Sequence, residues 1–245
     1  VAYASAVYGF LAILLSARAA AILVGGRGSV FWPALFIWIG TPLLFYMYVA
    51  PPFSHACSAF AVALFVNLWL HVRQRWTAAG AFALGLAAAL MTMVREQDAF
   101  IALGPAIDFA VSQLRHAGLA KTLGAAAAGV AGTALGYLPQ LAAYAALNGY
   151  PGPAEHVSRK MYWTSPWGPS VLFSPEHGFF FWTPLALIAL AGLLLVRERI
   201  VAAALWVMVV SQVYVAGSVA SWSVAGAFGQ RRFICLTVVM VIGLA

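Results

Sequence analysis

Two consecutive arginines, Arg231 and Arg232, follow a segment that contains two glycines, Gly226 and Gly229. Because glycine tolerates the backbone angles of a tight turn, the chain is expected to turn just before the two cations. A guanidinium group presents paired N–H donors that match two oxygens of a phosphate. The pattern therefore predicts that at least one of these arginines binds a phosphate. The alternative is that the pair anchors a helix to lipid headgroups.

A second charged cluster, Arg95-Glu96-Gln97-Asp98, follows a long apolar segment. Arg95 and Asp98 are three residues apart, so they could pair on one face of a helix. Ionisable residues that border a membrane mark a substrate path or form an ordinary interfacial charge cluster. Nothing in the local sequence decides between these two alternatives.

Ser54 and His55 begin another apolar segment, directly after Pro51-Pro52 and Phe53. Ser54 could cap the N-terminus of a helix that starts here. An exposed helix N-terminus also attracts phosphate, and His55 could add a hydrogen-bond donor beside it. A single histidine more often has a structural role, so the sequence leaves both roles open.

The segment 148–178 combines aromatic residues with two cations, Arg159 and Lys160. Aromatic side chains mark membrane interfaces, and their flat faces also stack on sugar rings, so Trp163 fits either role. Lys160 could hold an anionic headgroup. Other aromatic residues that fit these roles are Tyr150, Tyr162, Trp167 and, further along, Trp182.

The composition indicates which elements must position these residues. Hydrophobic residues make up 64% of the chain and charged residues 8%, against roughly 45–50% and about 25% in soluble domains. The apolar residues form uncharged blocks near the length of a transmembrane helix. Residues 81–92 lack the alternation of a barrel strand, so helices are expected instead. The fold class is therefore predicted to be all-α, a polytopic transmembrane helix bundle.

About nine helices of this kind are expected. They lie at 2–22, 31–49, 54–71, 77–94, 98–113, 121–147, 179–196, 200–218 and 233–245. Residues 1–245 form one transmembrane domain, with an outer loop at 148–178 and an outer segment at 221–232 inserted between helices. Because the chain starts at Val1 without Met and stops inside an apolar run, we expect a piece of a longer protein.

The distribution of cations predicts the orientation. Eight of the 13 Lys and Arg residues lie in alternate short loops, which the positive-inside rule assigns to the cytoplasm. They are Arg18, Arg27, Arg73, Arg75, Arg115, Lys121, Arg197 and Arg199. The net charge of +7 is thereby explained by topology, and no nucleic-acid partner is expected. Asp108, seven residues before Arg115, is expected to form an ion pair near the inner interface.

Other common chemistries lack their motifs. The sequence has no phosphate-binding Walker loop, no GxGxxG after a strand, no HExxH and no CxxC. Neither a metal nor a cofactor is therefore expected. The irregular polar segments gather on the predicted outer face, so any site is expected there.

Five motifs occur in an order typical of one enzyme family. They are SHACSAF at 54–60, VREQD at 94–98, YLPQ at 137–140, LFSPEHGFFFWTPL at 172–185 and WSVAGAFGQRRF at 222–233. In this order the chain resembles the bacterial GT-C membrane glycosyltransferases of the protein-mannosyltransferase and aminoarabinose-transferase type. The last two motifs are the most specific, and the resemblance covers most of the chain.

The resemblance implies a multi-pass enzyme of the cell inner (plasma) membrane. Such an enzyme takes a sugar from a polyprenyl-phosphate carrier and passes it to a lipid, glycan or protein acceptor on the outer side, inverting the anomeric centre. The usual catalytic base is an aspartate in the first outer loop. That loop is expected to precede Val1, so no catalytic residue is assigned and the chain alone is expected to be inactive. The substrate-binding candidates are His55, Arg95, Lys160, Trp163, His177, Arg231 and Arg232.

Two other functions remain open at this stage. A flippase or transporter of lipid-linked sugars would need polar groups near the bilayer midplane and broken helices in paired repeats. The sequence shows no internal repeat and few charges at that depth. An O-antigen ligase or polymerase would, like a glycosyltransferase, place arginines on the outer face.

Overall fold

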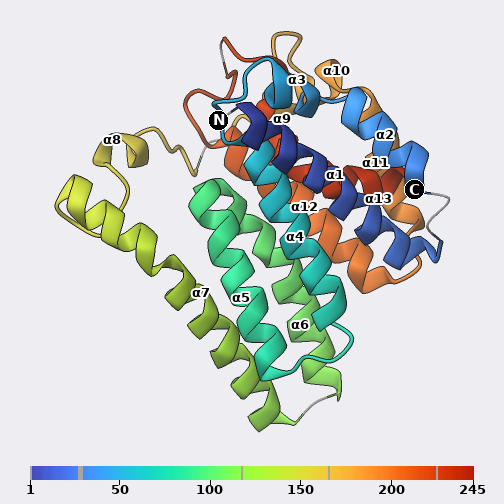
Figure 1. Cartoon of the computed structure of the whole chain (residues 1–245), viewed down its shortest axis with the longest axis vertical. Helices are drawn as coiled ribbons and strands as arrows, with labels where there is room; N and C mark the ends of the chain where they lie inside the picture. The colour runs from blue at the N-terminus through green and yellow to red at the C-terminus, as the bar shows by residue number, and fades with distance from the viewer. Residues whose placement is uncertain (1, 27–29, 117, 165, 225) are drawn as a thin grey trace.

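The computed structural model describes residues 2–26, 30–116, 118–164, 166–224 and 226–245. Within these ranges the regular structure is helical, and one isolated β-bridge joins Met161 to Val219. The all-α class predicted from the apolar blocks is confirmed for this part of the chain (Figure 1).

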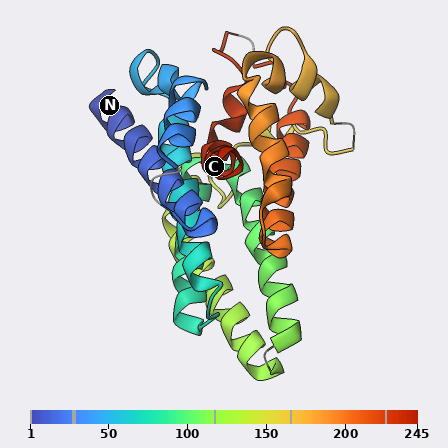
Figure 2. The same ribbon diagram turned by 90° about the vertical axis from the view of Figure 1, so that its right-hand side faces the viewer.

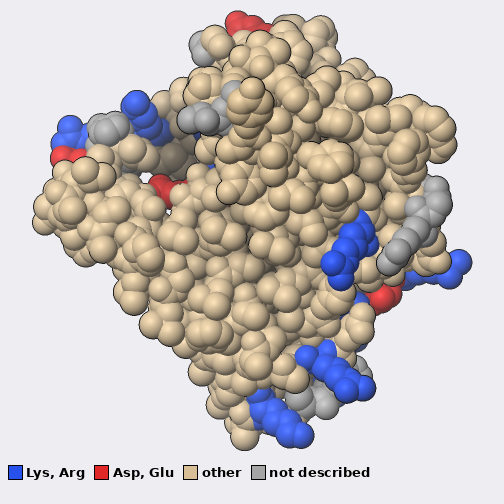
Figure 3. Space-filling view, viewed as in Figure 1, with Lys and Arg blue, Asp and Glu red and all other residues tan. Residues whose placement is uncertain are grey.

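Three of the described helices are long and apolar enough to cross a membrane, judged by length and composition. They are residues Tyr3–Val24 of α1 (Ala2–Val24), α4 (His55–Val72) and α12 (Arg199–Gly217). Most of the face drawn in Figure 3 is uncharged, and its Lys and Arg side chains lie at the lower end, where α6 and α7 meet in Figure 1, along the right-hand edge and at the upper left. These features are typical of a membrane protein.

The remaining helices are shorter or more irregular. They are α2 (Phe31–Ile39), α3 (Leu43–Tyr48), α5 (Ala78–Val94), η2 (Glu96–Ala102), α6 (Leu103–His116), α7 (Leu119–Asn148), α8 (Glu155–Ser158), α9 (Gly168–Phe173), α10 (Phe179–Trp182), α11 (Leu185–Gly192), η3 (Leu193–Leu195), η4 (Arg231–Leu236) and α13 (Thr237–Leu244). Here α denotes an α-helix and η a 3₁₀ helix.

Prolines divide two segments that were predicted as continuous helices. The segment 31–49 is α2 and α3, because Gly40 ends α2 and Pro42, which has no N–H to donate, stands before α3. The segment 179–196 is divided at Thr183-Pro184 into α10 and α11, followed by η3. Both segments are helical, as predicted, but neither is one continuous helix.

The core centres on α4. This helix packs between α1 and α5, and η4 also packs on it. Its side chains Phe65 and Trp69 are among the largest that are fully buried. Helix α13 lies between α1 and α11, so the C-terminal end of the chain joins α1 to α11 (Figures 1 and 2).

Asp108 of α6 ties three helices together. Its carboxylate accepts hydrogen bonds from Arg73 at 3.0 and 3.3 Å and from the Trp69 indole at 2.8 Å. Arg73 also donates to Glu198 at 2.7 Å. The sequence correctly predicted an ion pair for Asp108, but Arg115 was the wrong partner. The partner is Arg73, the C-cap residue of α4, whose side chain reaches Asp108 of α6.

Helix α7 packs on α5 through glycines, and leans away from the other helices in Figure 1. A Cβ atom added to Gly132 would collide with the carbonyl oxygen of Phe82, and one added to Gly85 with that of Gly129. The two backbones therefore touch, which is a typical way for membrane helices to associate.

We expect Gly132→Val to weaken the α5–α7 contact, because the new side chain has no room against Phe82. Overpacking of this kind costs typically about 1–3 kcal/mol. Gly124→Val is the matched control, since a Cβ atom at Gly124 meets nothing within 4 Å. Unfolding by detergent titration measures both variants. Equal losses of stability would show that helix propensity, and not the close contact, is responsible.

Candidate functional site

A cavity of about 530 Å³ with several charged residues in its lining lies where α5 gives way to η2. Its basic lining residues are Arg95, Lys160 and Arg232, and Trp163 stands beside them. We call it the basic cavity. Four of the seven predicted substrate-binding residues thus surround one space, although they come from three distant parts of the sequence.

Arg95 is positioned by an abrupt change in backbone conformation between α5 and η2. Helix α5 ends at Val94, and Arg95 adopts an extended conformation before η2 begins. Its guanidinium lies 3.0 Å from His55 Nδ1 and donates to Gln97 Oε1 at 2.8 Å. Because arginine can only donate, Nδ1 of His55 is the acceptor in this contact.

His55 therefore positions the Arg95 side chain through this hydrogen bond and does not itself line the cavity. It is buried, and its ring contacts the rings of Tyr46 and Phe53 at centroid distances of 4.6 and 5.9 Å. Ser54 occupies the N-cap position of α4, but its side chain makes no capping hydrogen bond. The prediction that Ser54 caps this helix is wrong.

The predicted pairing of Arg95 with Asp98 is also wrong. Among the described residues the two form no ion pair. Asp98 is fully buried and accepts a hydrogen bond of 2.5 Å from Ser58 Oγ. The prediction assumed that both residues lie on one α-helix, whereas Arg95 is extended and η2 has 3₁₀ geometry.

Arg232, like Arg95, is a half-buried cation of the cavity, whereas Lys160 is exposed. Its Nη2 donates to the oxygen atoms of Ser221 at 3.2 and 3.3 Å, whereas its Nε is buried without a partner. Burial, together with the charges of Arg95 and Arg231, lowers the pKa of Arg232 to about 10. This cluster of positive charge is costly unless an anion joins it.

Two glutamines fix the backbone beneath these cations. Gln97 Nε2 donates to the carbonyl oxygen of Arg232 at 3.0 Å and to Gln212 Oε1 at 3.2 Å. Gln212 Nε2 donates in turn to the backbone oxygen of Gln97 at 3.0 Å. Sequence reasoning assigned neither glutamine a role. The available signal was Gln212, an amide side chain within the predicted transmembrane helix 200–218.

Lys160 and Trp163 reach the cavity through backbone pairing. The amide of Ala220 donates to the carbonyl of Lys160 at 2.8 Å, and that of Tyr162 to the carbonyl of Ser218 at 2.6 Å. Trp163 packs beside Phe100 and keeps 42% of its surface exposed. A half-open aromatic face beside cations can stack on a ring that carries a phosphate.

Arg231 and His177 lie outside the basic cavity. The Arg231 guanidinium sits 5.2 Å from the centre of the Phe53 ring. His177 Nε2 donates to the carbonyl of Ala227 at 3.0 Å, and its ring stacks on Trp182. His177 therefore holds the turn that precedes the arginines.

Glu96 is the carboxylate among the described residues that line the basic cavity. Burial raises its pKa, so its negative charge is partly disfavoured there. None of the ion pairs in the described part of the chain includes Arg95, Lys160 or Arg232. The cavity can therefore accept an anion without first breaking an internal salt bridge.

Comparison with known proteins adds no assignment: no family model, no curated protein and no solved structure matches the chain. Within the described residues, no group of three or more His, Cys, Asp and Glu residues could hold a metal ion.

Proposed function

We propose that this chain belongs to a membrane glycosyltransferase of the GT-C type. It transfers a sugar from a polyprenyl-phosphate carrier to a lipid, glycan or protein acceptor of the cell envelope. The observation that carries the proposal is the basic cavity, where three cations without carboxylate partners stand beside an exposed tryptophan. A phosphate and a sugar are the groups that these side chains fit.

The chemistry of transfer explains why cations are needed. An oxygen of the acceptor attacks the anomeric carbon, and the bond from that carbon to the phosphate oxygen breaks. The electron pair leaves with the lipid phosphate, and the acceptor proton goes to a base that we leave unassigned. Arg95 and Arg232 stabilise the negative charge that develops on the phosphate. Trp163 stacks on the sugar, and Lys160 contacts a further phosphate oxygen.

The proposed setting is a nine-helix, multi-pass bundle in the cell inner (plasma) membrane. The basic cavity faces outward, because Arg95, Lys160 and Arg232 belong to the minority of cations opposite the cytoplasmic set. The long apolar tail of the carrier then stays in the bilayer while its phosphate reaches the interface. The three apolar helices long enough to cross a membrane support this setting.

We expect the purified chain to bind a polyprenyl monophosphate more tightly than the uncharged polyprenol of equal length. Native mass spectrometry of the detergent-solubilised chain measures both. Arg95→Gln should reduce binding of the phosphate about tenfold or more, since a hydrogen bond to a charged group contributes about 1.5–3 kcal/mol. Arg159→Gln, which removes an exposed cation outside the cavity lining, is the matched control.

Equal binding of the phosphate and the alcohol would contradict the proposal. Transfer itself is assayed with the lipid-linked sugar and an envelope acceptor in the natural full-length protein. A protein that binds the donor and moves it across the bilayer without transfer would instead be a flippase.

A further inference from the structure

A second cavity with basic residues in its lining, of about 690 Å³, lies at the opposite end of α5. One wall is the α4–α5 turn, with Arg75, Trp76 and Thr77. The other wall is the end of α6 and the start of α7, with Gln113 and the residues 118–121. Arg75 and Lys121 are its cations, and its described lining contains no carboxylate. We call it the Arg75–Lys121 cavity.

The first turn of α7 opens into this cavity. Gly118 stands at the N-cap position, where it offers no side chain to the free backbone N–H groups of the 30-residue helix. The first turn also contains no acidic residue. Free N–H groups and the positive end of the helix dipole favour an anion at this position.

A buried glutamine beside the helix terminus also lacks a protein partner. Gln113 lines the cavity with 9% of its surface exposed, and its amide makes no hydrogen bond to any described residue. Because Gln113 is a buried residue that lines the cavity without a protein partner for its amide, it indicates a ligand that supplies hydrogen-bonding atoms.

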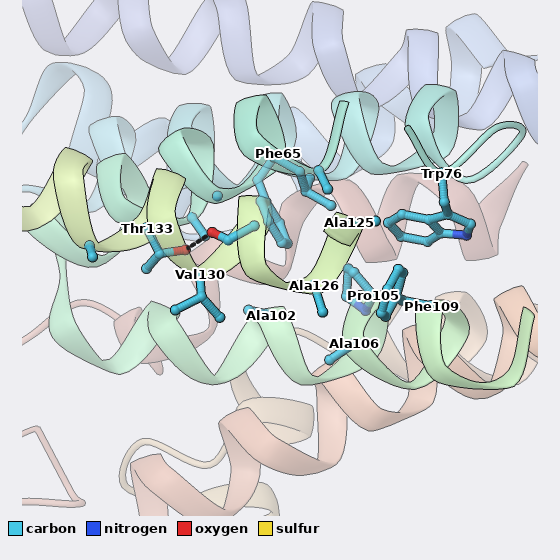
Figure 4. Close-up of a pocket in the computed structure, with 16 residues that line it drawn as sticks. Phe65, Trp76, Ala102, Pro105, Ala106, Phe109, Ala125, Ala126, Val130 and Thr133 are labelled. Atoms are coloured by element: carbon cyan, nitrogen blue, oxygen red, sulfur yellow. Dashed lines mark hydrogen bonds between the residues drawn. The ribbon is translucent and has the colours of Figure 1, made fainter. Parts of the chain in front are cut away.

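Trp76 also lines an apolar pocket of about 510 Å³ between α5, α6 and α7. Figure 4 shows Trp76 at one end of this pocket, near Phe109, with its ring nitrogen on the edge away from Val130. The rest of the lining is almost entirely alanine, glycine and other apolar side chains. A basic cavity that shares Trp76 with an apolar pocket fits a molecule with a charged head and a hydrocarbon tail.

We propose that the Arg75–Lys121 cavity binds the phosphate of an anionic phospholipid, with one acyl chain in the apolar pocket. Arg75, Lys121 and the α7 N-terminus hold the phosphate oxygens, and the Gln113 amide donates to an oxygen of the headgroup or of its ester links. Arg75 and Lys121 belong to the set of cations assigned to the cytoplasm, so this is a lipid of the inner leaflet. The inference does not depend on the proposed sugar transfer.

The test uses the full chain in neutral detergent and measures its thermal unfolding with added lipid. Dioleoyl phosphatidylglycerol should raise the midpoint, whereas dioleoyl phosphatidylcholine and inorganic phosphate at the same concentration should not. Arg75→Gln/Lys121→Gln should reduce affinity for phosphatidylglycerol about tenfold to thirtyfold. Gln113→Leu, which fills the same space without polar atoms, should also weaken binding.

Arg197→Gln/Arg199→Gln is the matched control, because it removes two cations predicted to lie on the same side of the membrane but outside the cavity. This variant should keep the affinity of the unaltered chain. An equal loss in both double variants would overturn the proposal in favour of diffuse attraction. A full shift with inorganic phosphate alone would overturn the lipid as ligand, and equal shifts with both lipids would overturn the role of charge.

Discussion

Asp108→Ala is expected to lower the free energy of unfolding by about 3–5 kcal/mol, because it breaks a buried ion pair from one side. Asp108 is completely buried. Without its carboxylate, the Trp69 indole has no acceptor and Arg73 has no buried partner. These hydrogen bonds connect α6 to α4, and through Arg73 to Glu198 at the start of α12. The substitution therefore weakens the contacts among α4, α6 and α12 together.

Detergent-induced unfolding measures this loss of stability, and Glu155→Ala is the matched control. Glu155 is also a carboxylate bonded to an arginine, Arg159, at 2.6 Å, but both side chains are about three-quarters exposed. Exposed pairs contribute roughly 0–1 kcal/mol. Similar effects of the two substitutions would show that burial does not strengthen the role of Asp108.

The helical class and most helix positions follow from the sequence, because uncharged apolar blocks have few alternatives in a membrane. The positions of the breaks do not follow as directly. Pro42 and Pro184 divide predicted helices, whereas Pro139 lies within the continuous helix α7. A proline is tolerated where neighbours satisfy the freed carbonyl group, and the sequence alone does not show those neighbours.

The candidate site was predictable in its residue types and not in its contacts. Cations beside aromatic residues on one predicted side indicated Arg95, Lys160, Trp163 and Arg232. Pairing across the fold was hidden, because the bridge between Met161 and Val219 joins segments that are far apart in sequence. For the same reason, His55 was expected to bind the substrate, whereas it accepts a hydrogen bond from Arg95.

Arg231 and Arg232 are adjacent, and no feature of the local sequence distinguishes their roles. The structure places Arg232 in the wall of the basic cavity and Arg231 against the ring of Phe53. A cation over an aromatic ring needs charge alone, which lysine also supplies. A bidentate phosphate contact needs the planar guanidinium fork, which lysine lacks.

We therefore expect Arg232→Lys to reduce donor binding and sugar transfer roughly tenfold to a hundredfold, the equivalent of about 1.5–3 kcal/mol for a charged hydrogen bond. Arg231→Lys should leave both nearly unchanged. Transfer from the lipid-linked donor is measured in the natural full-length protein, at matched expression. If both lysine variants keep normal turnover, the arginines act as headgroup anchors. If Arg231→Lys alone is impaired, the phosphate lies beside Phe53 and outside the basic cavity.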